Sequence, residues 1–253
     1  MTQSNPIALI TGGSRGLGRS MALHLADRGV DSIITYRSKE KEAHDVVDAI
    51  AKKGRKAIAL RLDVADSASF GAFADSVKAA LEKLGRDRFD YLVNNAGMGA
   101  HAAFLETTEE TFDELVKVHV KAPFFLTQKL VPLMADGGRI VNVSSGLTRF
   151  TFPGYAAYAT MKGAVEVMTH YMARELAARK ISVNTLAPGA IETDFGGGAV
   201  RDNPDVNKMV AAQTALGRVG LPDDIGGAVA MLLSPGAGWI TGQRIEASGG
   251  MVL

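Results

Sequence analysis

The strongest constraint on the fold is an N-terminal segment that passes from an apolar strand through a glycine-rich turn into a helix. Residues 7–11 form a short apolar run of the buried-strand type, and residues 21–26 have a helical pattern. Gly12, Gly16 and Gly18 stand between them, spaced Gly-x-x-x-Gly-x-Gly. A helix that begins at such a turn directs its free N–H groups at it, where they can bind a pyrophosphate. The segment predicts a nucleotide-binding unit, with a purely structural turn as the alternative, because the spacing differs from the Gly-x-Gly-x-x-Gly fingerprint.

The rest of the chain continues the alternation of strands and helices. Further apolar runs occupy residues 32–36, 57–62, 89–93, 139–144, 181–186 and 240–245, and helical patterns lie between them. Asp66 or Ser67 is predicted to cap the helix that continues to Leu84. Strands that alternate with helices form right-handed crossovers and a parallel sheet covered on both faces. We therefore expect an α/β, doubly wound Rossmann fold with a seven-stranded parallel sheet, in a single domain spanning residues 1–253.

The composition excludes several classes of protein and of site. The chain has 253 residues, of which 47% are apolar and 22% charged, and its net charge is +1. This balance gives no reason to expect nucleic acid or a membrane as a partner. The chain contains no cysteine, which excludes disulfides, thiol catalysis and thiolate metal ligands, and we expect no metal. Because the N-terminus lacks a basic start followed by an apolar stretch, a soluble cytoplasmic protein is expected.

The residues after the second strand favour NADP over NAD. An acidic residue at this position would bind the ribose hydroxyls of NAD, but the chain has Tyr36, Arg37 and Ser38. Arg15 adds a second guanidinium inside the glycine turn. Planar guanidiniums match the oxygens of a 2′-phosphate, although either arginine alone could be ordinary surface charge.

A second cluster of reactive side chains lies in the stretch from Ser145 to Lys162. Tyr158 and Lys162 are four residues apart, so on a helix they share one face. A nearby ammonium favours the phenolate, but reaching a pKa near 7 requires a shift of roughly 3 units and therefore a second cation, such as an oxidised nicotinamide ring. Ser145 follows an apolar strand and can donate to a carbonyl oxygen. Each residue alone has a structural alternative, because Tyr-x-x-x-Lys occurs by chance and serines commonly cap strands or helices.

Taken together and in order, these motifs resemble those of the short-chain dehydrogenase/reductases, in their shorter, single-domain branch. The motifs are Thr11-Gly12, Gly16-x-Gly18, Asn94-Asn95-Ala96-Gly97, Ser145, Tyr158-x-x-x-Lys162 and Pro188-Gly189. The resemblance covers the whole chain. It implies a Rossmann fold in which a nicotinamide cofactor and the substrate share one cleft.

The resemblance also implies a role for individual residues. Tyr158 is the acid/base, Ser145 orients the substrate oxygen, and Lys162 binds the nicotinamide ribose and lowers the pKa of Tyr158. Asp63 and Val64 match positions that meet the adenine. The remaining implied cofactor contacts, besides Tyr158 and Lys162, are Gly12, Ser14, Arg15, Gly16, Leu17, Gly18, Tyr36, Arg37, Ser38, Asn94, Ala96, Gly97, Pro188, Gly189, Ile191 and Thr193.

One position departs from the family pattern. His119 stands where the family has an Asn whose main-chain carbonyl is thought to hold a water that links the Lys to solvent. Pro123 has no N–H, so the carbonyl of His119 loses its helical donor and can accept from a water. His119 is therefore a candidate member of a proton relay, through its main-chain carbonyl and its imidazole. The alternative is that it only packs between helices.

The second half of the chain carries the expected substrate side. Residues 194–216 contain three consecutive glycines at positions 196–198, and we expect a mobile lid there, with a disordered surface loop as the alternative. The candidate pocket residues are largely apolar or aromatic: Met98, His101, Leu147, Phe150, Phe152 and Tyr155. The helix after Lys162 is apolar over much of its circumference, which indicates a homo-oligomer, a dimer or tetramer.

We therefore expect an NADPH-dependent oxidoreductase that reduces a ketone or 3-ketoacyl-type carbonyl to the alcohol. Three alternatives use the same motifs. An NAD(P)-dependent alcohol or sugar dehydrogenase would work in the oxidative direction, and a regulator would bind NADP without catalysis. A sugar-nucleotide epimerase would need a larger C-terminal domain than 253 residues allow.

Overall fold

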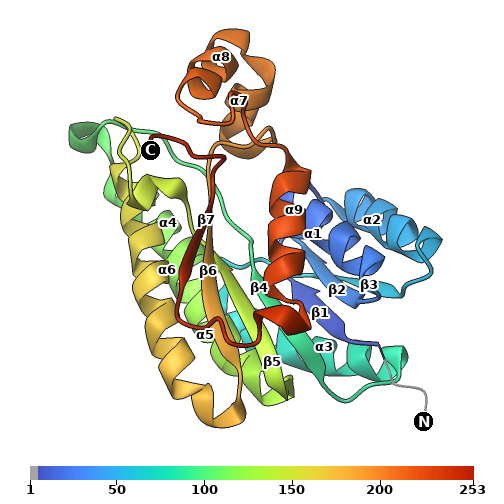
Figure 1. Cartoon of the computed structure of the whole chain (residues 1–253). Helices are drawn as coiled ribbons and strands as arrows, with labels where there is room; N and C mark the ends of the chain where they lie inside the picture. Colours follow the sequence, from blue (N-terminus) through green and yellow to red (C-terminus); the bar gives the residue numbers. More distant parts are fainter. Residues whose placement is uncertain (1–4) are drawn as a thin grey trace.

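The centre of the molecule is one seven-stranded parallel sheet with the strand order β3-β2-β1-β4-β5-β6-β7 (Figure 1). The computed structural model describes residues 5–253. The strands are β1 (Ile7–Ile10), β2 (Asp31–Tyr36), β3 (Ala57–Arg61), β4 (Phe89–Asn94), β5 (Met134–Val143), β6 (Ser182–Pro188) and β7 (Arg244–Ala247). Every neighbouring pair is parallel. This arrangement confirms the predicted doubly wound Rossmann fold.

Helices cover both faces of the sheet. They are α1 (Gly16–Asp27), α2 (Glu40–Lys52), α3 (Phe70–Leu84), α4 (Glu109–Val116), α5 (Ala122–Leu130), α6 (Ala156–Glu175), α7 (Ala199–Asp202), α8 (Pro204–Ala212) and α9 (Pro222–Leu232). A π-helical segment, Lys117–Lys121, joins α4 to α5. Helices α1, α2 and α9 pack on one face, whereas α3, α5 and α6 pack on the other. The short helices α7 and α8 lie above one end of the sheet (Figure 1).

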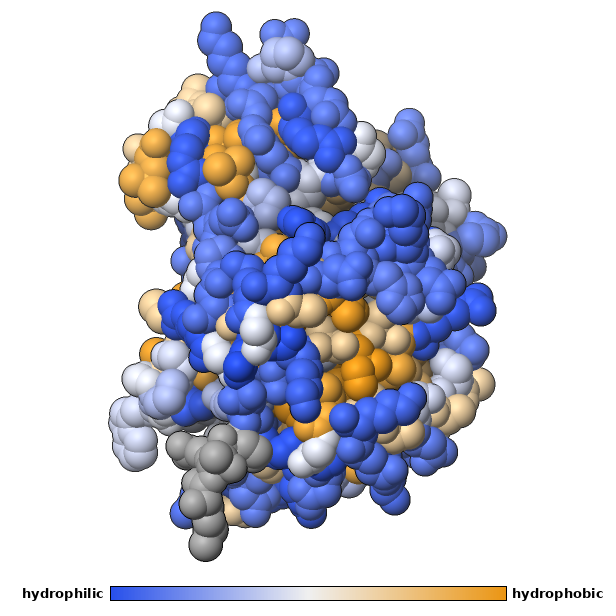
Figure 2. Space-filling view, turned by 90° about the vertical axis from the view of Figure 1, so that its right-hand side faces the viewer, coloured by the Kyte–Doolittle hydropathy of each residue, from blue (hydrophilic) through white to orange (hydrophobic). Residues whose placement is uncertain are grey.

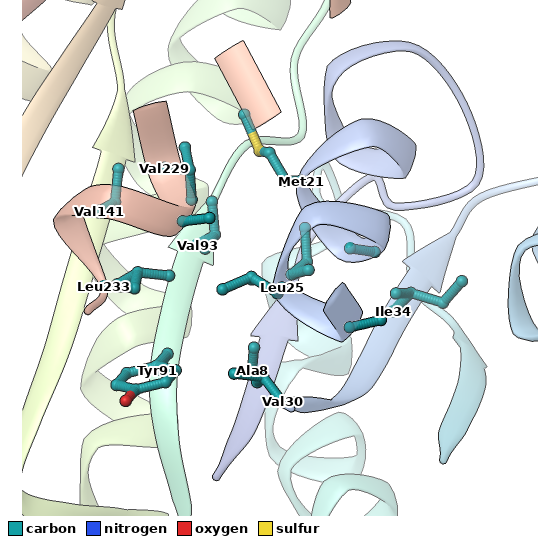
Figure 3. Packing of buried hydrophobic residues seen from close by; sticks show 14 of the residues in the cluster. Ala8, Met21, Leu25, Val30, Ile34, Tyr91, Val93, Val141, Val229 and Leu233 are labelled. Atoms are coloured by element: carbon teal, nitrogen blue, oxygen red, sulfur yellow. The ribbon is translucent and has the colours of Figure 1, made fainter. Parts of the chain in front are cut away.

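Two hydrophobic cores follow from the alternation of side chains along the central strands. In β1, Ala8 and Ile10 face the core under α1 and α9, whereas Ile7 and Leu9 face the core under α3 and α5. Figure 3 shows the first core, where Leu25 of α1 lies among apolar side chains of the strands and of α9. Because both faces of the sheet are covered, the central strands are continuous apolar runs and do not alternate between apolar and polar residues.

Two predicted strand starts differ from the structure by more than one residue. The last strand was expected at residues 240–245 but begins at Arg244. Gly242 has a φ of +68°, and Asn184 accepts from the N–H of Gln243 through its side chain, so the backbone before Arg244 turns before it joins the ladder. The fifth strand begins at Met134, earlier than the predicted 139. The predicted cap at Asp66 is confirmed, since its carboxylate accepts from the N–H of Ala68.

The edge of the sheet at β3 has apolar side chains that are only partly buried, among them Ile58 and Leu60. Figure 2 views the molecule from this side and shows an apolar area surrounded by hydrophilic residues. Within residues 5–253, no helix combines the length and the apolarity needed to cross a membrane.

The topology brings the predicted motifs to one end of the sheet. The strand order changes direction between β1 and β4, and in open α/β sheets ligands bind at the carboxyl ends of the strands at this point. The glycine turn follows β1, the Asn94–Gly97 motif follows β4, and Ser145 follows β5. We therefore expect the functional site at this end of the sheet, where the strand order changes direction.

Candidate active site and cofactor cradle

Ser145, Tyr158 and Lys162 converge at the carboxyl end of β5. Tyr158 and Lys162 lie one turn apart on α6 and are 7% and 5% exposed. The Lys162 ammonium lies 5.6 Å from the centroid of the Tyr158 ring and donates to the carbonyl oxygen of Val143 at 2.8 Å. Because that hydrogen bond ties α6 to the end of β5, it holds both side chains beside Ser145.

The backbone around Ser145 leaves its hydroxyl proton free to be donated. Ser145 is extended, with φ −158° and ψ 152°, and caps the short turn Gly146–Thr148. Its Oγ accepts from the N–H of Leu147 at 3.2 Å. An oxygen that accepts from the main chain can still donate its own proton to a substrate carbonyl.

The pKa of Tyr158 differs from the expectation. Burial raises the pKa of the phenol well above its ordinary value, and a hydrogen bond with Ser145 opposes the rise. Burial also lowers the pKa of Lys162, to about 8. Burial therefore dominates, since it penalises the charged form of both groups.

His119 is buried beside Tyr158 and Lys162. Its Nε2 lies 2.8 Å from the carbonyl oxygen of Met98, and its ring meets that of Tyr158 edge-on at 5.3 Å and 87°. Burial, and then the positive charge of Lys162, lowers the pKa of the imidazole to about 3. The ring is therefore neutral. Nε2 also lies 3.3 Å from the N–H of Met98, but its contact with the carbonyl oxygen is the shorter one, so we assign the proton to Nε2. Among the described residues, Nδ1 finds no hydrogen-bond partner.

The helix around His119 is irregular, as the position of Pro123 predicts. The N–H of Ala122 donates to the carbonyl of Lys117, five residues earlier, and the segment is a π-helix. Pro123 cannot donate to the carbonyl of His119. A cavity of about 20 Å³, large enough for one water, is lined in part by His119, Pro123 and Lys162.

The glycine turn has the shape of a phosphate cradle. Gly12 and Gly16 have φ values of +66° and +53°, which side chains rarely adopt. A Cβ on Gly13 would stand 2.7 Å from the Cβ of Ile34, so the turn packs tightly on β2. Within residues 5–253, no side chain caps the N-terminus of α1, since Arg15 at the cap makes no such bond. The bare turn and the open N–H groups fit a dinucleotide pyrophosphate.

Three residues hold this cradle in place: Thr11 and Asn95, which the sequence motifs include without a role, and Thr35, which sequence reasoning missed. Thr11 Oγ1 accepts from the N–H groups of Asn95 and Ala96 at 2.9 and 3.0 Å. Thr35 Oγ1 accepts from Gly12, and the Asn95 amide donates to the carbonyls of Thr11 and Gly12. The Asn-Asn-Ala-Gly motif thus fixes the turn from β4. The two adjacent asparagines of this motif were the sequence signal that could have indicated these contacts.

The predicted cofactor residues gather from both halves of the chain. At one edge, Tyr36 pairs with Arg61 across β2 and β3. The guanidinium of Arg61 donates to the carbonyl of Arg37 at 3.3 Å, which sequence reasoning missed because it depends on strand register. At the centre, a Cβ on Gly16 would lie 3.7 Å from Thr193, so the glycine turn and the segment after β6 meet. The other predicted cofactor residues lie at the carboxyl ends of β1 to β4 and β6, in the turns that follow these strands or in the first turn of α1, namely Gly12, Ser14, Arg15, Leu17, Gly18, Ser38, Asp63, Val64, Asn94, Ala96, Gly97, Pro188, Gly189 and Ile191.

The predicted substrate residues divide into two groups. Phe195 lies over Tyr158, with ring centroids 5.8 Å apart, and His101 meets Tyr155 edge-on at 5.0 Å. Phe150 and Phe152 instead pack with Val210, Val219 and Met251 at the base of the predicted lid, with Leu147 beside them. Phe150 is buried there, so it supports the lid rather than offering a surface to a substrate.

In the part of the chain that the structure describes, no group of three metal-ligating side chains gathers. The site consists of a phenol, a hydroxyl, an ammonium and a neutral imidazole beside an anion cradle. Such a set can transfer a proton to a carbonyl oxygen and hold a phosphate-containing cofactor.

Comparisons with known proteins agree with this geometry. Residues 12–252 match the family model described as enoyl-(acyl carrier protein) reductase. A hydroxynaphthalene reductase-like protein, Arp2 of Metarhizium brunneum, is 37% identical over 97% of this chain and 94% of its own. The structure of LugOII, a promiscuous reductase that catalyses keto-reduction at C1 during lugdunomycin biosynthesis, superposes with a TM-score of 0.93 at 38% identity, covering 99% of both chains.

The angucycline C-6 ketoreductase LanV, solved with bound NADP, superposes with a TM-score of 0.92 at 38% identity over 98% of this chain and 95% of its own. A further structure of LanV contains rabelomycin as well as NADP. The match of sequence extends over nearly the whole chain, and the sheet order and the site motifs agree with it. The chain belongs to the short-chain dehydrogenase/reductase family.

Proposed function

We propose that the protein is an NADPH-dependent reductase that converts a ketone on a flat, aromatic or polycyclic substrate into the alcohol. One observation carries the proposal: Ser145, Tyr158 and Lys162 meet beside the glycine cradle at the same end of the sheet. The relatives named for naphthol or angucycline ketone reduction support the substrate class. The apolar and aromatic side chains near Tyr158 support it as well.

NADPH supplies the hydride when it is bound. The N-terminus of α1 and the glycine turn hold its pyrophosphate, and Arg37 and Arg61 lie together at the expected place of the 2′-phosphate. The guanidinium of Arg15 instead contacts Asp194 at 3.4 Å, so it has to leave that carboxylate to reach the phosphate. The segment that carries Ile191 and Thr193 faces the glycine turn and holds the nicotinamide end. Solved relatives that contain NADP support this assignment.

Tyr158 donates its proton to the carbonyl oxygen of the substrate, and Ser145 donates a hydrogen bond to the same oxygen. Burial favours the neutral phenol, which is the form that can donate. Lys162 stands 5.6 Å from the ring and supplies a positive charge as the phenolate develops.

His119 belongs to the path that returns a proton to Tyr158. The cavity of about 20 Å³ that His119 and Lys162 share has room for one water, which would accept from Lys162. Two acceptors of His119 are available to such a water, the main-chain carbonyl beside Pro123 and the neutral Nδ1. Histidine can thus take the place of the family's asparagine.

Residues 194–216 act as a lid over the site within a single domain of residues 1–253. Gly196, Gly197 and Gly198 all have positive φ values, so the segment turns where other residues would be strained. Phe195 precedes them and already contacts the ring of Tyr158. We infer that the lid opens at these glycines to admit the substrate.

The protein is a homo-oligomer, a dimer or tetramer, in the cytoplasm. Large apolar side chains stand half-exposed on α5 and α6: Phe124 at 47%, Phe125 at 42%, Val167 at 57% and Tyr171 at 67%. Such an area on two neighbouring helices is typical of a subunit interface. Light scattering at working concentration tests this, and a monomeric mass would contradict it. Cell fractionation tests the compartment.

The function is tested by NADPH oxidation with a panel of bicyclic aromatic ketones, 3-ketoesters and small aliphatic ketones. We expect the bicyclic aromatic ketones to have the highest kcat/KM of the three classes. Turnover only of alcohols with NADP⁺ would favour a dehydrogenase, the second candidate. NADPH binding without turnover of any member would favour a regulator.

A further inference from the structure

A chain of four charged side chains lies beneath the catalytic serine and outside the group that meets the substrate. Arg244 donates through Nε to Glu166 and through Nη1 to Glu246, both at 2.9 Å. Arg149 contacts the same Glu246 with two nitrogens, at 2.8 and 2.7 Å. Three of these side chains are less than a quarter exposed, and the Arg149–Glu246 contact is bidentate. Such a pairing fixes geometry better than a single exposed ion pair.

One end of this chain holds the turn that carries Ser145. Arg244 Nη2 donates to the carbonyl oxygen of Ser145 at 3.3 Å, and Thr148 Oγ1 lies 3.0 Å from the same oxygen. Glu166 accepts from Thr148 and from Ser144 at 2.7 and 2.8 Å. Because Glu166 lies one turn beyond Lys162 on α6, one carboxylate joins the serine turn to the catalytic helix.

The other end holds the C-terminal segment 249–252. Arg149 donates to the carbonyl of Val252 at 2.8 Å and to that of Met251 at 2.6 Å. This segment in turn pairs with the base of the lid, residues 213–216. The main-chain hydrogen bonds run from Ala215 to Gly250 at 3.1 Å, from Leu216 to Gly249 at 3.0 Å and from Val252 to Gln213 at 2.9 Å.

We propose that Arg149 and Arg244, joined through Glu246, are positioning residues that hold the Ser145 turn in register with the base of the lid. The inference rests on the proposed function, because Ser145 and the lid must act on one substrate. Displacing the lid base would move the C-terminal segment, and through Arg149 it would move the turn that presents the Ser145 hydroxyl. This junction, formed by Arg149, Glu246 and Arg244, thus lets one substrate contact the Ser145 hydroxyl and the lid at the same time.

The carboxylate at the junction stays ionised under working conditions. Its hydrogen bonds with Arg149, Ser248 and Arg244 lower the pKa of Glu246 to about 2. The junction therefore acts as a constant brace near neutral pH.

Arg179 provides a matched control for Arg149. It contacts one carboxylate, Asp136, at 2.7 Å, and donates to the carbonyls of Val131 and Met134 at 2.7 and 2.6 Å. Arg179 therefore makes the same kinds of contact as Arg149, but it does so near the start of β5, at the opposite end of the strand from Ser145.

The test compares Arg149→Met and Arg179→Met by substrate kinetics, NADPH binding and amide hydrogen exchange. We expect Arg149→Met to lower kcat/KM for the ketone about tenfold, the size of losing a charged hydrogen bond. Its NADPH affinity should be unchanged, and the amides of Ala215 and Leu216 should exchange faster. Arg179→Met should match the wild type in all three measurements, and Arg149→Lys should recover part of the loss.

Equal exchange at residues 213–216 in the wild type and Arg149→Met would overturn the proposal, as would equal kcat/KM in the two arginine variants. If Arg149→Met does not bind NADPH, Glu246→Gln takes its place, because it removes the charge that joins the two arginines, and wild-type exchange at residues 213–216 in that variant overturns the proposal. The exchange measurement needs no turnover. A wild type that reduces no ketone would therefore refute the proposed function while leaving the junction testable.

Discussion

Nε2 of His119 lies 2.8 Å from the carbonyl oxygen of Met98, and this contact sets the tautomer of a buried imidazole. Nε2 must carry the proton that it donates, so Nδ1 is an acceptor. Burial and the Lys162 cation lower the pKa of the ring to about 3, so it is neutral near neutral pH. The side chain therefore acts as an anchor for the loop after β4 and as an acceptor beside Lys162.

The first prediction concerns His119. His119→Ala removes both the anchor and the acceptor, and we expect kcat to fall about tenfold, the size of leaving a buried polar group unpaired. His119→Asn keeps a donor for Met98 and should retain most of the activity. The pKa of the imidazole is about 3, so the ring does not titrate between pH 5 and 8. Neither variant should therefore change the pH dependence of kcat in that range. Full activity and an unchanged profile in both variants would exclude the side chain from the mechanism.

The second prediction concerns the choice of cofactor. Arg37→Asp places a carboxylate where a 2′-phosphate is expected, so kcat/KM for NADPH should fall at least about tenfold while that for NADH holds or rises. Lys41→Asp makes the same change of charge on an exposed residue of the neighbouring helix. An equal loss in that control would assign the effect to general electrostatics. An unchanged NADPH/NADH preference in Arg37→Asp would contradict the phosphate site.

The third prediction concerns acid stability. Arg149, Ser248 and Arg244 hold the pKa of Glu246 at about 2 instead of 4.5. A lowered carboxyl pKa contributes stability above the unfolded value, and this contribution is lost as the pH falls from 4.5 towards 2. After discounting for partial exposure, we expect Glu246→Gln to lower the unfolding free energy by about 1–2 kcal/mol at pH 7. Urea denaturation should show this difference shrinking below pH 4.5, and a difference independent of pH would refute the linkage.

The fourth prediction concerns the lid. The Phe195 ring lies 5.8 Å from that of Tyr158, so a flat substrate bound over Tyr158 would stack against it. Phe195→Ala should raise KM for a bicyclic aromatic ketone several-fold, about the value of one aromatic contact. A small aliphatic ketone serves as the internal control and should lose little. Equal changes for both ketones would show that Phe195 does not select the substrate.

The architecture could be predicted because it follows from patterns local in sequence. Apolar runs alternate with helical ones, and a parallel sheet brings the residues after each strand to one end, so Ser145 and the glycine turn had to lie near each other. The π-helix was also accessible, since the missing N–H of Pro123 marks where regular hydrogen bonding fails.

The rest depends on contacts between distant parts of the chain. The raised pKa of Tyr158 results from burial among neighbours on other elements, which the spacing of Tyr158 and Lys162 does not contain. Arg61 meets Arg37 only through the register of β2 and β3. The junction of Arg149 and Glu246 joins residues 97 positions apart, and no local pattern connects them.

The most direct test of the central claim is Tyr158→Phe, measured by NADPH oxidation and by NADPH binding in parallel. The substitution removes one hydroxyl and keeps the ring against His119 and Phe195, so the fold and the cradle should persist. We expect Tyr158→Phe to lose ketone reduction while its affinity for NADPH is unchanged. Turnover close to that of the wild type would contradict it.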